Sequence, residues 1–464
     1  TLFPYTTLFR SLEGLRVLDL SYVFAVPYIG GLMADLGAEV IKVEGPHRLD
    51  LTRGIAFARY AENDPGPDPW NRSGVFHVLN RGKKSVVLDL NQAEGRAILS
   101  ELVKKSDVLL ENFTPRVLRK WQLQYEDLKK LKPSLIMLSN TGYGSGGPWS
   151  EYPSQGTTLE ATMGITNYTG YRDDKPWKVG QSYPDFLATW AGLTALMAAI
   201  IHMRRTGLGQ WIDLGMYQVG AALLAEPMLQ HQIGRATPRR LGNEDEEHVP
   251  SNLYPASGED RWIAITVRND AQWVKLSELI GQPNLAMDPR FSSCEARRCH
   301  REEVNALVAD WTRQRDSEST TVLLQHHGIA AGPLLNSRDL LLDAHLKHRR
   351  FYERVDHKGT IGTRPMIGRP YRMRFRHPTV QGPGPGFGEH NATVLTELAA
   401  MDASAIERLS ASKTTSDIPE QPGIAHPWDL QKSMQFKTLV AIDSDYREKL
   451  DRACQEGEEG TPRA

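Results

Sequence analysis

The chain contains little cysteine and almost no net charge. Three cysteines, at positions 294, 299 and 454, occur among 464 residues. An odd and sparse set argues against a disulfide framework and favours a reducing compartment, so we expect a cytoplasmic protein. The 55 basic and 56 acidic residues leave a formal net charge of −1. No global field therefore favours nucleic acid or an anionic membrane as a partner.

Familiar short motifs are also absent. Neither GxSxG nor HExxH occurs in the sequence. Cys294, Cys299 and His300 lie close together, but their spacing matches no standard zinc pattern, so we read them as ordinary helix or loop residues and expect no metal. The apolar run 186–201 is shorter than the roughly 20 residues of a membrane span, and its Ala and Gly suit a packed core helix.

Short apolar strands alternate with helical segments in the first third of the chain. This alternation predicts an α/β fold with a parallel sheet covered on both faces, whose ligands bind at the carboxyl ends of the strands. Strands are expected at 15–20, 39–44, 85–90, 107–113, 135–140 and 210–216, with helices at 25–38, 91–106, 186–205 and 217–230.

A second αβ unit is expected from about residue 253, after a polar segment that we interpret as a linker containing a functional loop. It is followed by a strand pair and a polar tail. The predicted elements are a strand at 261–267, helices at 270–281, 301–314 and 318–328, a strand pair at 351–357 and 369–375, and helices at 392–400 and 443–456.

Asp185 stands at the start of the apolar helix and has two possible roles. As an N-cap, its carboxylate would accept backbone N–H groups and stabilise the helix by about 1 kcal/mol. The same carboxylate is a competent nucleophile, because Asp can form acyl intermediates and the helix dipole would keep it ionised. The two roles do not exclude each other. A glycine-rich loop at 141–148 exposes backbone beside the sheet, or is a plain surface turn.

Several motifs occur in an order that points to one family. They include LEGLRVLDLSYVFAVPYIGGLMADLGAEVIKVEGP, LNRGKKSVVLDL, DVLLENFTPRVL, LIMLSNTGYGSGGPWS, YPDFLATWAGLTALMAAI and RLGNEDEEHVPSNLY. Over about residues 12–410 the chain resembles the family III CoA-transferases, which include formyl-CoA and carnitine CoA-transferases. The resemblance implies a large Rossmann-like parallel-sheet domain built from both chain ends, a smaller inserted αβ domain, and an interlocked homodimer.

The domain boundaries follow from this resemblance and from the composition. We expect 12–225 and 346–411 to form the large domain and 226–345 to form the small domain with its linkers. Residues 1–11 are expected to be a non-native or disordered leader, and 412–464 a tail without an assigned role.

The resemblance also implies the reaction: CoA passes from an acyl-CoA thioester to a free carboxylic acid. Asp185 maps onto the family's nucleophile, which forms an anhydride and then an enzyme–CoA thioester. Gly242 and Asn243 match a loop that covers the active site, with an oxyanion-type role. The acidic segment 244–247 faces solvent or selects a cationic acceptor. Coenzyme A thioester is expected as a substrate, and no tightly bound cofactor.

Binding of coenzyme A requires cations for its phosphates and a site in which its adenine can stack. Lys83 and Lys84 could meet its phosphates, or form a solvated charged turn. Arg116 could replace an arginine that the family often carries at the position of Thr114. Tyr143 is a candidate for the pocket wall, with plain core as the alternative. The residues expected to contact CoA are Asn80, Lys83, Lys84, Asn112, Phe113, Arg116 and Tyr143.

Two other functions stay open. A racemase of the same fold would need a proton-transferring His before the nucleophile, but Gln155 and Gly156 occupy that stretch, so transfer is favoured over racemisation. Alternatively, the protein is a non-catalytic CoA-binding scaffold in which Asp185 only caps its helix.

Overall fold

The computed structural model describes residues 10–54, 59–180, 183–234, 240–359, 361–374 and 377–459, with side chains as far as 452. These residues fall into two compact units. The first comprises segments within 1–165, 179–229 and 345–464, and the second comprises 166–178 and segments within 230–344. Residues 166–178, which the sequence analysis places in the large domain, therefore belong to the second unit. Most of the leader expected at 1–11 lies outside the described residues.

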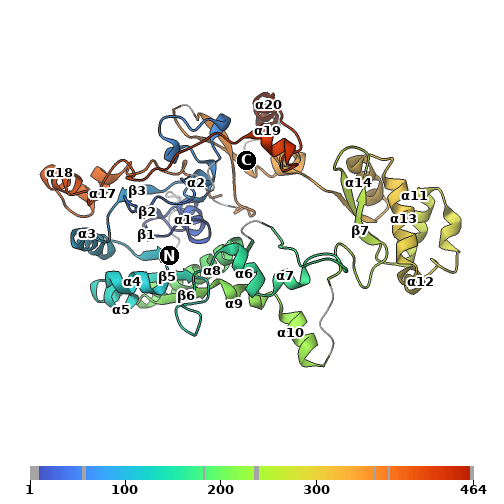
Figure 1. Ribbon diagram of the computed structural model, residues 1–464, viewed down its shortest axis with the longest axis horizontal. Helices are drawn as coiled ribbons and strands as arrows, with labels where there is room; N and C mark the ends of the chain where they lie inside the picture. Colours follow the sequence, from blue (N-terminus) through green and yellow to red (C-terminus); the bar gives the residue numbers. More distant parts are fainter. Residues whose placement is uncertain are drawn as a thin grey trace, which may run out of the picture. The chain divides into compact units, whose positions relative to one another are not determined.

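The first unit is built on a six-stranded parallel sheet (Figure 1). Its order is β3-β2-β1-β4-β5-β6, so the direction of strand addition reverses between β1 and β4. The predicted parallel α/β fold is confirmed. The strands are β1 (Arg16–Asp19), β2 (Glu39–Glu44), β3 (Lys84–Val87), β4 (Val108–Glu111), β5 (Ile136–Thr141) and β6 (Trp211–Gly215).

Helices cover the sheet on both faces. Helices α1 (Ala25–Asp35) and α8 (Tyr183–Thr206) pack together over one hydrophobic cluster, and α3 (Ala93–Lys104) belongs to the cluster on the other side. Close approach of α8 requires Gly192, because a Cβ there would lie 2.8 Å from Cδ1 of Ile29. This packing fixes the amino-terminal end of α8 beside that of α1, where the candidate nucleophile lies.

Helix α8 has 24 residues and a mean hydropathy of 1.7 over its most apolar window. Among the described residues it is the one helix long and apolar enough to cross a membrane, a test that buried core helices also pass. Its buried residues pack against α1, α6, β5 and β6 of the first unit, as expected for a core helix.

The carboxyl-terminal part of the chain returns to the first unit. Helix α17 (Asn391–Glu397) lies beside β3 (Figure 1), and Oδ1 of Asn391 accepts a hydrogen bond of 2.7 Å from the Val87 N–H. Asp35 in α1 forms buried ion pairs of 2.7 Å with Arg81 and 2.9 Å with Arg369. These contacts attach the returning segment to elements from the first hundred residues.

Two predicted elements are wrong. The second strand of the late hairpin is β11 (Thr363–Ile367), paired antiparallel with β10 (Tyr352–Asp356), and not 369–375. Arg369 instead holds a buried ion pair, and Pro370 supplies no N–H donor. The helix expected over 217–230 is two helices, α9 (Met216–Ala222) and α10 (Ala225–Gln232), with Pro227 in the first turn of the second.

The tail beyond 412 lies against the first unit through specific contacts. Thr414 is buried and its carbonyl accepts the Asp89 N–H at 2.8 Å. The backbone of Trp428 exchanges two hydrogen bonds, of 2.7 and 2.8 Å, with the side chain of Asn63. The tail contains α19 (Leu430–Gln435) and α20 (Tyr446–Glu459), preceded by α18 (Ala403–Ala411).

The second unit is an antiparallel sheet with helices packed on it. The sheet has the order β7-β8-β9, and Trp273 and Phe291 lie in its hydrophobic cluster. Its elements are β7 (Ser251–Pro255), β8 (Trp262–Thr266), α11 (Asp270–Ile280), α12 (Cys294–Cys299), α13 (Arg301–Thr312), α14 (Ser317–His326), β9 (Ala330–Pro333) and α15 (Ser337–Leu342).

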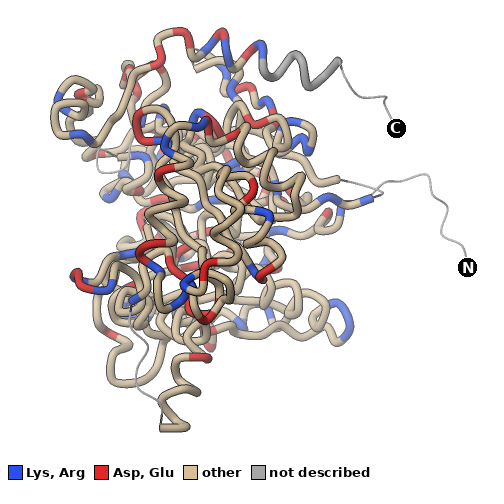
Figure 2. The backbone as a smooth tube through the Cα atoms, turned by 90° about the vertical axis from the view of Figure 1, so that its right-hand side faces the viewer, with Lys and Arg blue, Asp and Glu red and all other residues tan. Residues whose placement is uncertain are grey.

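The remaining α-helices of the described residues are short. They are α2 (Gly74–Leu79), α4 (Pro115–Trp121), α5 (Tyr125–Leu131), α6 (Gly156–Thr162), α7 (Ile165–Tyr168) and α16 (Ala344–His348). Figure 2 shows Lys and Arg interspersed with Asp and Glu along the chain, in keeping with the near-zero net charge.

Candidate active site

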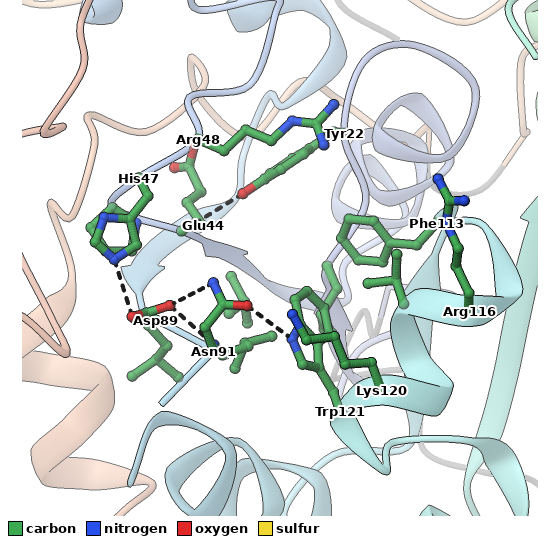
Figure 3. A pocket seen from close by; sticks show the side chains of 17 residues that line it. Tyr22, Glu44, His47, Arg48, Asp89, Asn91, Phe113, Arg116, Lys120 and Trp121 are labelled. Carbon is green, nitrogen blue, oxygen red and sulfur yellow. Dashed lines mark hydrogen bonds and ion pairs between the residues drawn. The ribbon is translucent and has the colours of Figure 1, made fainter. Parts of the chain in front are cut away.

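A pocket of about 480 Å³ lies at the carboxyl ends of β1 to β4 (Figure 3). Tyr22 follows β1, His47 and Arg48 follow β2, Asn91 follows β3, and the segment 113–121 follows β4. This is where the strand order reverses, and open α/β sheets bind ligands at that position.

Aromatic rings form part of the pocket wall. Phe113 makes edge-to-face contacts with Tyr22, at 5.9 Å between ring centroids, and with Trp121, at 5.5 Å. The Asn112 side chain holds Tyr22 in place: it accepts the Tyr22 N–H at 3.0 Å and donates to the Tyr22 carbonyl at 2.7 Å. The predicted residues Asn112 and Phe113 are thus brought together, Phe113 in the wall and Asn112 behind it.

Three cationic side chains line the same pocket. Arg48, Arg116 and Lys120 are exposed, and none forms an ion pair with another residue in the described part of the chain. Arg116 is the predicted cation, whereas Arg48 and Lys120 were missed by the sequence analysis. In Figure 3, Arg116, Phe113 and Trp121 lie on one side of the pocket and Arg48 extends beside Tyr22. Guanidinium and ammonium groups of this kind suit phosphate binding.

The opposite side of the pocket carries His47 between two carboxylates. One ring nitrogen, Nε2, lies 3.1 Å from Asp89, and the other, Nδ1, lies 2.7 Å from Glu420 in the tail. Burial acts to lower the pKa of His47, but the hydrogen bonds to Glu420 and Asp89 outweigh it and raise that pKa. His47 therefore links the loop after β2 to Asp89 after β3 and to the tail.

Lys83 lies outside the pocket lining, in a buried ion pair. Its Nζ donates to Asp19 at 2.5 Å, to the Pro27 carbonyl at 2.7 Å and to Oδ1 of Asn80 at 2.8 Å. All three ammonium protons are used, so this arrangement leaves no donor for a phosphate and is not a solvated turn. Burial lowers the pKa of Lys83 to about 8. Lys84 pairs with Glu39 at 2.7 Å and is also not a pocket residue.

Asp185 lies in the first turn of α8, two residues after the helix begins. Burial raises its pKa from 3.8 to about 6, and hydrogen bonds from its own N–H and from the Ala25 N–H act to lower it. The Thr189 hydroxyl donates to the carbonyls of Ala25 and Asp185, at 2.8 and 2.9 Å, and so ties α1 to α8. The carboxylate therefore lies at the first turns of two helices, where the backbone N–H groups of Ala25 and Asp185 favour its ionised form.

The other predicted residues are not among those that line this pocket. Gly242 and Asn243 belong to the second unit, where Nδ2 of Asn243 donates to the Tyr171 hydroxyl at 3.2 Å. Their oxyanion role beside Asp185 stays a prediction. Tyr143 packs edge-to-face against Trp149 at 5.5 Å, in an aromatic cluster away from the pocket lining. No group of three or more His, Cys, Asp or Glu side chains in the described ranges is arranged to hold a metal ion.

Comparisons with known proteins identify the family of the chain. The sequence model of CoA-transferase family III matches residues 12–391. The chain is 36% identical to succinyl-CoA–D-citramalate CoA-transferase of Chloroflexus aurantiacus, over 87% of this chain and 98% of that protein. It is 33% identical to succinate–glutarate CoA-transferase of Agrobacterium fabrum, over 85% and 97%.

A solved structure shares the fold. The crystal structure of a CaiB/BaiF family protein from Brucella suis superimposes with a TM-score of 0.74 and 32% identity, covering 84% of this chain and 99% of that one. The chain thus belongs to CoA-transferase family III, and the protein is a CoA-transferase.

Proposed function

We propose that this enzyme transfers CoA from an acyl-CoA thioester to a free carboxylic acid, with Asp185 as the nucleophile. The observation that supports this most is the position of its carboxylate. The β1–α1 loop carries Tyr22 in the pocket wall and, three residues later, Ala25, whose N–H contacts Asp185. A nucleotide bound among Arg48, Arg116 and Lys120 therefore lies one short loop away from a partly buried carboxylate.

The proposed cycle has four substitutions at carbonyl carbon. The Asp185 carboxylate attacks the thioester carbonyl, and the C–S bond breaks to give a mixed anhydride and the CoA thiolate. The thiolate attacks the aspartyl carbonyl and releases the donor acid, leaving an aspartyl–CoA thioester. The acceptor carboxylate then attacks this thioester, and the released thiolate attacks the acceptor's acyl carbon. The new acyl-CoA leaves and the Asp185 carboxylate is restored.

The surroundings of Asp185 suit its carboxylate as the nucleophile and its acylated carbonyl as the group that is attacked later. With a pKa of about 6, the carboxylate is ionised at neutral pH, yet its partial burial removes much of the water that would weaken it as a nucleophile. The N–H groups of Ala25 and Asp185 can donate to the oxyanion that forms when the thiolate or acceptor attacks the aspartyl carbonyl.

The substrates that we propose are dicarboxylic acids. The two relatives named above carry succinate or its CoA thioester in their names, together with citramalate and glutarate. We propose succinyl-CoA as donor and a dicarboxylate of similar length as acceptor. We also propose that the second unit is the inserted domain and that two chains form the interlocked homodimer that the family resemblance implies.

Two measurements together test this function: formation of the new thioester and detection of a covalent CoA adduct on the enzyme. The enzyme is incubated with succinyl-CoA and glutarate, new thioester is measured by chromatography, and the Asp185 peptide is examined by mass spectrometry. We expect glutaryl-CoA and a peptide heavier by CoA minus one water. Loss of an α-proton without exchange would instead indicate a racemase, and CoA binding without either change would indicate a scaffold.

Substituting the pocket cations is expected to weaken acyl-CoA binding. Replacing Arg116 or Lys120 with methionine should raise KM for the acyl-CoA about tenfold each while kcat changes little, because a charged hydrogen bond to a phosphate contributes about 1.5 kcal/mol or more to substrate and transition state alike. Steady-state kinetics at fixed salt measures this. Arg119→Met is the control, since Arg119 is on the same helix but pairs with Glu151 outside the pocket. An equal KM change in the control would contradict the assignment.

A further inference from the structure

Side chains form hydrogen bonds with the backbone N–H and carbonyl groups of the loop between β1 and α1. The Ser21 N–H donates to Asp19 at 3.0 Å, and the Ser21 carbonyl accepts from Nζ of Lys42 at 2.7 Å. Asn112 binds both the N–H and the carbonyl of Tyr22. A loop fixed in this way is pre-organised before any ligand arrives.

Val23 adopts an unusual backbone conformation in this loop. Its φ is +75°, in the left-handed region that a β-branched residue rarely enters. Such a conformation costs on the order of 1–3 kcal/mol and persists only where its surroundings impose it. The next residue, Phe24, is the N-cap of α1, so the turn at Val23 sets the direction in which the helix starts.

Asp50 is the group that holds Val23. The Val23 N–H lies 3.3 and 3.4 Å from the two carboxylate oxygens of Asp50. Asp50 is itself buried and fixed: Oδ1 accepts the N–H and hydroxyl of Thr52 at 2.9 and 2.8 Å, and Oδ2 lies 3.1 Å from Nζ of Lys42. Both oxygens therefore face donors, and neither faces solvent.

We propose that Asp50 is a positioning residue for the transfer reaction. It holds the left-handed turn at Val23 so that the first turn of α1 presents the Ala25 N–H to the Asp185 carboxylate. This inference rests on the proposed role of Asp185 as nucleophile. When the contact between the Val23 N–H and Asp50 is lost, Val23 relaxes to a negative φ and the Ala25 N–H moves away from the Asp185 carboxylate. The carboxylate then loses one of the two N–H groups that keep it ionised, and the aspartyl carbonyl loses an oxyanion donor.

Asp50→Asn is the direct test, because an amide cannot replace this carboxylate. Whichever way the amide is turned, its NH₂ faces either Lys42 or the Thr52 donors. We expect kcat/KM at neutral pH to fall about 10- to 100-fold. We also expect a change in the pH profile of kcat/KM. Its acidic limb, which lies near pH 6 in the wild type if Asp185 is the titrating group, should move up by about one pH unit, since a lost N–H donor raises a carboxylate pKa.

Two further variants separate positioning from stability. Thr52→Val removes another donor to the same carboxylate but leaves the Val23 contact, so the limb should stay in place and kcat/KM should change less than about threefold. Glycine adopts positive φ without strain. The double variant Val23→Gly with Asp50→Asn should therefore return the limb toward pH 6 and recover most of kcat/KM.

Hydrogen exchange of residues 21–33 supplies a readout besides activity. Asp50→Asn should accelerate exchange of the first amides of α1, and Thr52→Val should not. The inference is overturned if Asp50→Asn loses activity only in proportion to its folded fraction, with the limb unmoved, or if the double variant recovers nothing. If transfer survives Asp185→Asn, the proposed role of Asp185 as nucleophile fails and the positioning role with it, whatever the exchange shows.

Discussion

Asp185→Asn is expected to abolish CoA transfer, lowering kcat by at least about 10³-fold, as loss of a covalent nucleophile does in other enzymes. A carboxamide oxygen is too weak a nucleophile to form the anhydride. Binding of CoA should change little, because the pocket residues come from loops after β1 to β4 and Asp185 is not among them. Transfer assays and calorimetric titration with CoA measure the two quantities separately.

The same substitution should stabilise the fold. Burial raises the pKa of Asp185 from 3.8 to about 6, so the unfolded chain releases this proton first as the pH rises. The free energy of unfolding of the wild type therefore falls between about pH 4 and pH 6 and stays lower above it. The shift of about two pH units corresponds to about 3 kcal/mol at most. Asp185→Asn should lack this decrease and unfold at a higher temperature at pH 7.5.

Asp402→Asn is the matched control. Asp402 is an exposed N-cap whose side chain accepts the Ala405 N–H, a role that asparagine fills equally well. It should change neither transfer nor the decrease in the free energy of unfolding between about pH 4 and pH 6, because the Ala405 N–H keeps the pKa of Asp402 below its usual value. Residual transfer in Asp185→Asn above about 1% of the wild-type rate, after deamidation is excluded by mass spectrometry, would show that another group carries the acyl chain.

The strands could be predicted, and Asp185 could be singled out as a candidate nucleophile, because both leave a pattern in the sequence. A parallel strand buried on both faces reads as an apolar run, and Asp185 is a single acid at the start of a long run without charged side chains. The pocket cations could be predicted only in part. Arg48 and Lys120 follow strand ends, as Arg116 does, but a basic residue in a loop carries no sign of the surface that it faces.

Burial state was the main property that the sequence did not reveal. NRGKKS reads as a charged turn, yet Lys83 is buried and Lys84 is partly exposed. The partner that makes this possible is Asp19, on another strand. Val23 is similar: nothing in SYVFA indicates a left-handed residue, because its cause is Asp50, which is far away in sequence.

Lys83→Met is expected to destabilise the first unit by about 3–5 kcal/mol, because it leaves Asp19 as a buried charge without its closest partner. Burial acts to raise the pKa of Asp19, and Lys83, with Lys42, outweighs this and keeps the carboxyl ionised. The Lys83–Asp19 pair is also closely packed against α1, since a Cβ on Gly30 would lie 2.9 Å from Oδ2 of Asp19 and 3.0 Å from Nζ of Lys83. Urea unfolding followed by circular dichroism should show a lower midpoint.

The neighbouring lysine provides the control. Lys84→Met removes an ion pair with Glu39 in which both side chains are about one-third exposed, so we expect a change of at most about 1 kcal/mol. A double variant, Lys83→Met with Asp19→Asn, should recover part of the loss, because it removes the unpaired charge as well. If Lys83→Met instead kept its stability but raised KM for acyl-CoA, Lys83 would act as a phosphate ligand after all, and the buried pair would have to open when CoA binds.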